Sequence, residues 1–124
     1  MNRTLLVAVG GLVGSVARYW VAGWVQSFDG AQFPFGTLVV NVLGSFAIGA
    51  VMTLSLERGM IGPEVRILLT TGFCGGFTTM STFSYETMSL LRDGSAAGAL
   101  GNIMLTLMTC LLSTWLGSLT GRML

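Results

Sequence analysis

Histidine and lysine are both absent from the sequence, and charged residues make up only 9% of its 124 positions. Soluble domains carry about 25% charged residues. This scarcity, together with 52% hydrophobic residues and a mean hydropathy of +0.79, predicts a membrane protein. The absence of histidine removes the commonest general base and metal ligand, and the remaining residues form neither a nucleophile with its base nor a metal-binding spacing. We therefore expect no enzymatic activity.

Basic residues are also few, since six arginines leave a formal net charge of +1. The chain has no cluster of positive charge that would neutralise phosphates, which argues against a nucleic-acid partner. Its two cysteines, Cys74 and Cys110, both fall in apolar stretches and imply no structural disulfide. Long polar tracts are missing too, so we interpret residues 1–124 as a single integral membrane domain.

The apolar stretches divide the chain into segments of the length that crosses a bilayer, about 20 residues each. They predict an all-α protein with four transmembrane helices, at residues 4–25, 34–56, 63–91 and 97–119. The opening MNRTLLVAVGG is similar to a secretory signal, but its apolar run is longer and further spans follow, so we interpret it as the first helix. Four spans place both termini on one side of the membrane.

The arginines are distributed unevenly between the two sides of the membrane. The side of the termini holds four and the other side two: Arg3, Arg58, Arg66 and Arg122 against Arg18 and Arg92. Positively charged loops tend to remain in the cytoplasm. A bias this weak permits insertion in both orientations, which would allow an antiparallel dimer with its axis in the membrane plane. Insertion in a single orientation, with the termini inside, remains open.

Small residues four positions apart favour close packing of helices in lipid. The chain has 18 glycines and several such pairs: Gly10 and Gly14, Ser45 and Gly49, Gly94 and Gly98, and Gly117 and Gly121. Because so short a chain encloses little space by itself, these pairs favour a homo-oligomer over a monomer.

The third segment contains TTGFCGGFTTMSTFSYE at residues 70–86, with a pair of glycines followed by hydroxyl residues. Glycine destabilises helices, so we expect this helix to break near its middle. Irregular backbone at membrane depth persists only where protein buries it or where it lines a cavity, and its freed carbonyls are suitable ligands for a small hard cation. The alternative is that the glycines only let another helix approach.

Other polar residues lie within the predicted spans. Asn41 in the second span needs a hydrogen-bond partner, which is either another helix or an anion that its amide group faces. In the fourth span, polar or thiol side chains recur every four residues and share one helical face: Asn102, Thr106, Cys110 and Thr114. This stripe is either a contact between helices or one wall of a hydrated path.

Ionisable residues within a membrane segment are candidates for function. Arg18 lies in the first span, where it either has this role or extends its side chain to the headgroups, and Glu86 lies late in the third span. An exporter of organic cations would need an acid deep in the bilayer. The other acids belong to loops or helix ends: Asp29, Glu57, Glu64 and Asp93.

The third-span sequence GFCGGFTTMSTFSYE, with GTLVVNVLGS at residues 36–45 and Gly11-x-x-Gly14-x-x-x-Arg18, resembles the fluoride-channel family known as Fluc or CrcB. The resemblance covers the whole chain. It implies a passive channel in the bacterial inner membrane, formed by a dual-topology homodimer with two fluoride pores, that releases cytoplasmic fluoride. It also implies a structural sodium ion at the dimer centre, bound by the backbone carbonyls of Gly75 and Thr78.

The resemblance assigns the pore as well. Asn41 corresponds to the family's pore asparagine and Phe83 to one of two pore phenylalanines. The other polar contacts would come from Ser81, Thr82, Thr106, Cys110 and Thr114, with Arg18 and Glu86 at possible vestibules. The chain departs from the family at Met80, where a second phenylalanine is usual, and we expect altered fluoride throughput. Two other hypotheses remain: a small multidrug or guanidinium exporter, and a non-conducting assembly subunit.

Overall fold

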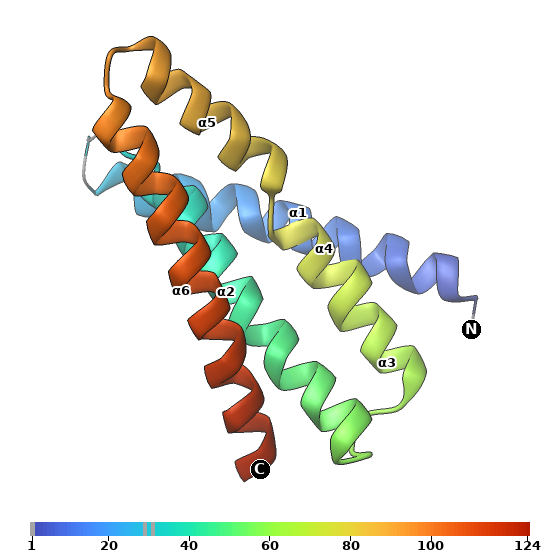
Figure 1. The fold of residues 1–124 in the computed structure, drawn as a ribbon. Helices are drawn as coiled ribbons and strands as arrows, with labels where there is room; N and C mark the ends of the chain where they lie inside the picture. The colour runs from blue at the N-terminus through green and yellow to red at the C-terminus, as the bar shows by residue number, and fades with distance from the viewer. Residues whose placement is uncertain (1, 29, 31) are drawn as a thin grey trace.

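The computed structural model describes residues 2–28, 30 and 32–124, and this part of the chain is helical apart from short connections (Figure 1). Asp29 lies outside the described residues. The helices, in chain order, are α1 (Arg3–Ser27), α2 (Phe35–Met52) with its π-helical continuation η1 (Thr53–Glu57), α3 (Pro63–Ile67), the π-helical segment η2 (Leu68–Cys74), α4 (Gly75–Phe77), α5 (Met80–Arg92) and α6 (Ala96–Met123). The expected all-α fold is confirmed.

Three of these helices are long and apolar enough to cross a membrane: Arg3–Ser27, Phe35–Glu57 and Ala96–Met123. The segment between the second and third of them forms one bent helix, in which α3, η2 and α4 lead into α5. Figure 1 shows the start of α1, the end of α6 and the α2–α3 connection toward one end of the molecule, and the turn between α5 and α6 at the other. The protein is an all-helical, multi-pass membrane protein.

Helix ends follow from local sequence. Asn2 precedes α1 and its Oδ1 accepts a hydrogen bond from the backbone N–H of Thr4, at 2.8 Å. Pro63 begins α3, where a backbone N–H would have no acceptor within the helix, so its absence in proline costs nothing. The turn after α5 contains Gly94 with φ +84°, a conformation that other residues rarely adopt. These caps place the connections where the polarity of the sequence changes.

α2 and α6 run side by side in the same direction (Figure 1). The Ser113 hydroxyl donates to the Val42 carbonyl at 2.8 Å, and further along both helices the Ser118 hydroxyl donates to the Gly49 carbonyl at 3.4 Å. A β carbon added to Gly49 or Gly117 would collide with the backbone of the other helix. These small residues therefore make contacts within one chain, whereas they were expected to favour contacts between chains.

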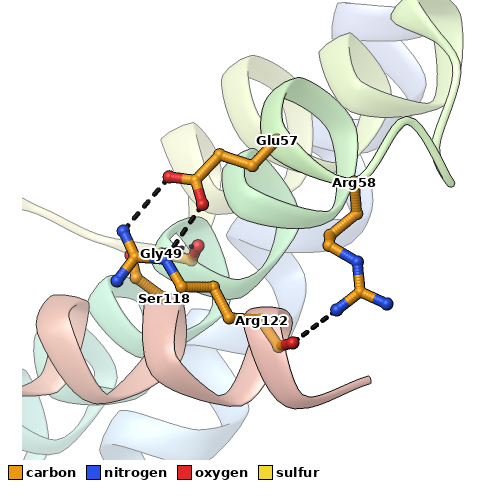
Figure 2. A network of polar contacts seen from close by, with 5 residues as sticks. All are labelled: Gly49, Glu57, Arg58, Ser118 and Arg122. Atoms are coloured by element: carbon orange, nitrogen blue, oxygen red, sulfur yellow. Dashed lines mark hydrogen bonds and ion pairs between the residues drawn. The ribbon is translucent and has the colours of Figure 1, made fainter.

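The far end of this helix pair carries a polar network of five residues, in which Glu57, Arg58 and Arg122 are exposed and Gly49 is buried: Gly49, Glu57, Arg58, Ser118 and Arg122 (Figure 2). The Arg122 guanidinium donates to both carboxylate oxygens of Glu57, at 2.9 and 3.1 Å. Arg58 donates to the backbone carbonyl of Arg122. The cluster links the end of η1 to the last turn of α6.

Candidate functional site

The bent helix is interrupted at Thr78 and Thr79, both of which have extended backbone, with φ and ψ of −91° and 160° and of −153° and 114°. The Thr79 hydroxyl oxygen caps α5 by accepting from the backbone N–H of Thr82 at 3.1 Å. The helix was expected to break near its middle, where a glycine pair is followed by hydroxyl residues. The break is there, at the hydroxyl residues, whereas Gly75 and Gly76 are helical. The break comes after them because the threonine side chain replaces a backbone acceptor at the start of α5.

Gly76 instead permits close approach, which was the alternative role considered for the glycines. A β carbon at this position would lie 2.6 Å from the Gly11 carbonyl oxygen and 3.0 Å from the Ser15 nitrogen, both on α1. One turn earlier, Gly72 lies against Gly10, and a β carbon added to Gly72 would lie 3.0 Å from the Gly10 Cα. The first part of the bent helix therefore packs directly against the backbone of α1.

Asn41 on α2 binds the backbone of the break at two points. Its Oδ1 accepts from the Thr79 N–H at 2.8 Å, and its Nδ2 donates to the Thr79 carbonyl at 3.2 Å. Asn41 is only 9% exposed, so these bonds satisfy most of a buried amide. The second hydrogen on Nδ2 is not used in either bond. Of the two roles expected for Asn41, the helix-to-helix bond is present in the structure.

These bonds leave two carbonyls of the break without their helical donors. In a continuous helix the Thr79 N–H would bond to the Gly75 carbonyl and the Thr82 N–H to the Thr78 carbonyl. The first N–H is bound by Asn41 and the second by the Thr79 hydroxyl. Within residues 2–28, 30 and 32–124, no hydrogen bond ends on either carbonyl. Free carbonyls are the ligand type that hard cations take.

A groove of about 730 Å³ runs along α2, between the bent helix on one side and α6 on the other. It brings together most of the residues expected in an ion pathway or at a cation site: Asn41, Gly75, Thr78, Met80, Phe83, Thr106, Cys110 and Thr114. Ser45 also lines it, one helical turn after Asn41, and among the described residues its hydroxyl has no hydrogen-bond partner. Ser45 is not among the residues predicted from the sequence, although its spacing of four from Asn41 was a usable signal.

A second cavity of about 390 Å³ lies on the other side of the break. Arg18, Glu86 and Thr82 line it, whereas Ser81 lines neither cavity. Thr79 lines both, so the residue that Asn41 holds stands between the two spaces. Arg18 does not only reach toward the surface, because its Nε donates to the Gly76 carbonyl at 2.9 Å. One Glu86 carboxylate oxygen is buried and has no partner in the described part of the chain.

The polar stripe on α6 does not face the groove along its full length. A residue four positions on is rotated by about 40° around an α-helix, so the stripe drifts off one face over three steps. Asn102 is 1% exposed and donates to Thr87 on α5, whereas Thr106, Cys110 and Thr114 line the groove. The stripe is therefore a helix contact at one end and a groove wall at the other.

Hydroxyl protons on this wall are directed away from the groove. Thr106 donates to the Asn102 side-chain oxygen at 3.3 Å, and Thr114 donates to the Cys110 carbonyl at 3.0 Å. Among the described residues that line the groove, donors left for a ligand include the second amide hydrogen of Asn41 and the hydroxyls of Ser45 and Thr71. Opposite them, Met80 and Phe83 lie three residues apart on α5, and both line the groove.

Comparison with known proteins gives one family model, described as "CrcB-like protein, Camphor Resistance (CrcB)", which matches residues 5–118. Among similar proteins is a "Fluoride-specific ion channel FluC" of Geotalea uraniireducens (strain Rf4), 47% identical over 124 residues and covering 100% of both chains. A protein with the same description from Geobacter metallireducens is 52% identical over 122 residues, 98% of each chain. Another, from Geobacter sulfurreducens, is 48% identical over 124 residues, 100% of each.

Proposed function

The chain belongs to the CrcB family of fluoride-specific ion channels, and from this membership we propose that it conducts fluoride passively through two pores in an antiparallel homodimer. The observation that carries the proposal is the groove along α2, which combines a few free hydrogen-bond donors with an aromatic side chain and has no acid among the described residues that line it. Such a surface suits an anion that must bind weakly and move on. It does not suit an organic cation.

The position of this groove supports a dimer. In a single chain, the groove lies on the outside of α2, between the bent helix and α6, where lipid tails would meet the hydroxyl of Ser45 and the carbonyls of Gly75 and Thr78. Polar groups in hydrocarbon are unfavourable unless they are paired or hydrated. A second copy, inserted in the opposite orientation, would cover them. The weak arginine bias permits that insertion.

A structural sodium ion fits the break. Gly75 and Thr78 each offer a carbonyl that has lost its helical donor, and both line the groove that the second copy would close. Two copies would contribute four carbonyl oxygens, the ligand type of hard cations. Sodium bound there supplies positive charge at the dimer centre without a charged side chain. The described residues contain no group of three or more Asp, Glu, His and Cys side chains placed to bind a metal, so backbone oxygen is the ligand that remains.

Fluoride would be passed between weak donors. The free amide hydrogen of Asn41 and the hydroxyl of Ser45 point to one side of the path, and the positive edge of the Phe83 ring contributes on the other. Thr106, Cys110 and Thr114 form the α6 wall, where oxygen and sulfur atoms would contact water around the ion. Beyond Thr79, the second cavity with Arg18, Thr82 and Glu86 would be the vestibule, with Ser81 near it on α5.

Met80 occupies the groove where an aromatic ring is expected. Its thioether is flexible and at best a weak acceptor, so it offers no positive edge to an anion. We expect the fold and the carbonyl site to be unaffected by it, and fluoride throughput to be lower than with phenylalanine.

Anion efflux from liposomes tests the proposal. Purified protein is reconstituted in liposomes loaded with potassium fluoride or potassium chloride, valinomycin is added, and each anion is followed with its own electrode. Rapid fluoride loss with retained chloride, absent from protein-free liposomes, is the expected result. Retention of both anions by the protein and by its Met80→Phe variant would contradict a channel, and movement of guanidinium coupled to protons would indicate an exporter.

A further inference from the structure

A buried chain of hydrogen bonds links the two walls of the groove without entering it. The Thr106 hydroxyl donates to the Asn102 Oδ1 at 3.3 Å, the Asn102 Nδ2 donates to the Thr87 hydroxyl at 2.9 Å, and that hydroxyl donates to the Phe83 carbonyl at 2.7 Å. The two ends, Thr106 and Phe83, line the groove. The two central residues line neither cavity, and both are buried, with exposed fractions of 1% for Asn102 and 7% for Thr87.

α5 is anchored at its start by the Asn41 bonds to Thr79 and along its length by α6. α5 is joined to α4 by the two extended residues of the break, packs mainly on α6 and touches α2 only slightly. An extended connection fixes the orientation of the following helix poorly, since each residue has two soft dihedral angles. Among the described residues, the bond between Asn102 and Thr87 is the one side-chain hydrogen bond that joins α5 to α6.

We propose that Asn102 and Thr87 are positioning residues for the pore, which fix Phe83 on α5 against Thr106 on α6. Neither residue contacts the ion, and both act through the groove residues at the ends of the chain. The proposal rests on the proposed channel function. It goes beyond a contact between helices, because the three hydrogen bonds run in one direction, from Thr106 to Phe83. The Thr87 hydroxyl is both acceptor and donor, so the geometry at the Phe83 end depends on the geometry at the Thr106 end.

The direction of the bonds determines which atoms of Thr106 face the groove. Because the Thr106 hydroxyl donates its hydrogen bond to Asn102 Oδ1, the Thr106 oxygen presents only lone pairs to the path. Without Asn102, the Thr106 hydroxyl is free to rotate and to donate into the groove, which creates a stronger anion contact. Weak contacts favour conduction and strong ones retain the ion. The bond chain therefore sets both the position of the ring and the strength of the opposite wall.

The test compares Thr87→Val, which keeps the shape and removes both bonds of the hydroxyl, with Thr87→Ser, which keeps both. Single-channel recording in planar bilayers is the readout, because loss of folded protein changes the number of channels but not the conductance of each. Thr87→Val and Asn102→Leu are expected to lower the fluoride conductance by about tenfold, the size of one lost buried hydrogen bond. Thr87→Ser is expected to stay near wild type.

The double variant, Thr87→Val with Asn102→Leu, is expected to be no worse than either single one, since the two act as a unit. Thr109→Val is the matched control, because Thr109 lies on α6 outside the groove and bonds only to its own helix. If Thr87→Val does not fold, Thr87→Ala is compared with Thr87→Ser in its place. A wild-type conductance in the Val or Ala variant, or additive losses, would overturn the proposal. A wild type that passes no fluoride would instead contradict the channel function.

Discussion

The two halves of the bent helix are held in place by different forces. The half before the break, α3 to α4, lies on α1 through direct contact of backbone with backbone, at Gly10 with Gly72 and at Gly76 with Gly11. The half after the break, α5, lies on α6 through buried side-chain hydrogen bonds centred on Asn102 and Thr87. Between the halves, Asn41 binds both backbone groups of Thr79, the second of the two extended residues.

This difference determines how each half responds to change. A contact between backbones has no side chain that can move aside, so the first half has one allowed depth against α1. A contact through hydrogen bonds is adjustable, because another side chain with the same donors restores it. The first half presents the carbonyl site and the second presents the pore ring. The rigid contact with α1 therefore supports the proposed sodium site, and the adjustable contact with α6 supports the proposed conduction path.

Gly76→Ala is expected to have the largest effect. Its β carbon would lie 2.6 Å from the Gly11 carbonyl oxygen, and overpacking of this kind costs about 1–3 kcal/mol. We expect a large loss of folded protein in size-exclusion chromatography and loss of fluoride efflux. Gly101→Ala is the control, since a β carbon there has nothing within 4 Å. Equal behaviour of the two variants would mean that the first half is not held by backbone contact.

Asn41→Ala is expected to have the next largest effect, because it leaves the Thr79 N–H free to return to the Gly75 carbonyl. An unpaired buried polar group costs about 1–3 kcal/mol, so the break should partly close and one free carbonyl should be lost. Sodium is expected to raise the melting temperature of the wild type by mass action and to raise that of Asn41→Ala much less. If sodium raised the melting temperature of both proteins by the same amount, Asn41 would not be needed for the carbonyl site.

Composition and spacing sufficed to predict the helical, multi-pass architecture and one bent helix, because hydropathy and glycine content act locally along the chain. The break near the middle of the third span is present, but a capping bond of Thr79 determines its position rather than the low helix propensity of Gly75 and Gly76. The glycine pairs were recognised as contact sites, but the contacts proved to be within the chain. A pattern of small residues does not identify its partner.

Most of the candidate pathway residues lie together in the groove, whereas their detailed roles depended on three-dimensional contacts. Asn102 and Thr106 look equivalent in sequence, four residues apart on one helix, yet one is buried against α5 and the other lines the groove. The drift of an α-helix relative to a spacing of four decides between them. Thr87 carried no signal, because a threonine that bonds back to its own helix is common in membrane segments. Its second bond, to Asn102, is visible only in the fold.

Met80→Phe is expected to have a moderate effect and to act on the adjustable half alone. A ring in the groove beside Phe83 adds a second positive edge for the anion, so fluoride efflux should rise by several-fold, with an unchanged melting temperature. The control is Met108→Phe, on an exposed face of α6 outside both cavities. Equal efflux rates for Met80→Phe and the wild type would show that this position does not limit throughput.

Glu57→Gln is expected to have the smallest effect, and it tests whether a polar contact matters by its position rather than by its presence. The bond between Glu57 and Arg122 is charged and joins both carboxylate oxygens (Figure 2), but each side chain is about half exposed. Exposed ion pairs are screened by water and salt and contribute little. Neither residue lines the groove, and Ser118 still joins α6 to Gly49. Fluoride efflux should therefore match the wild type at low and at high salt. A loss of efflux like that expected for Thr87→Val would mean that the far ends of α2 and α6 control the groove. Burial of a polar contact would then not indicate whether that contact affects the pore.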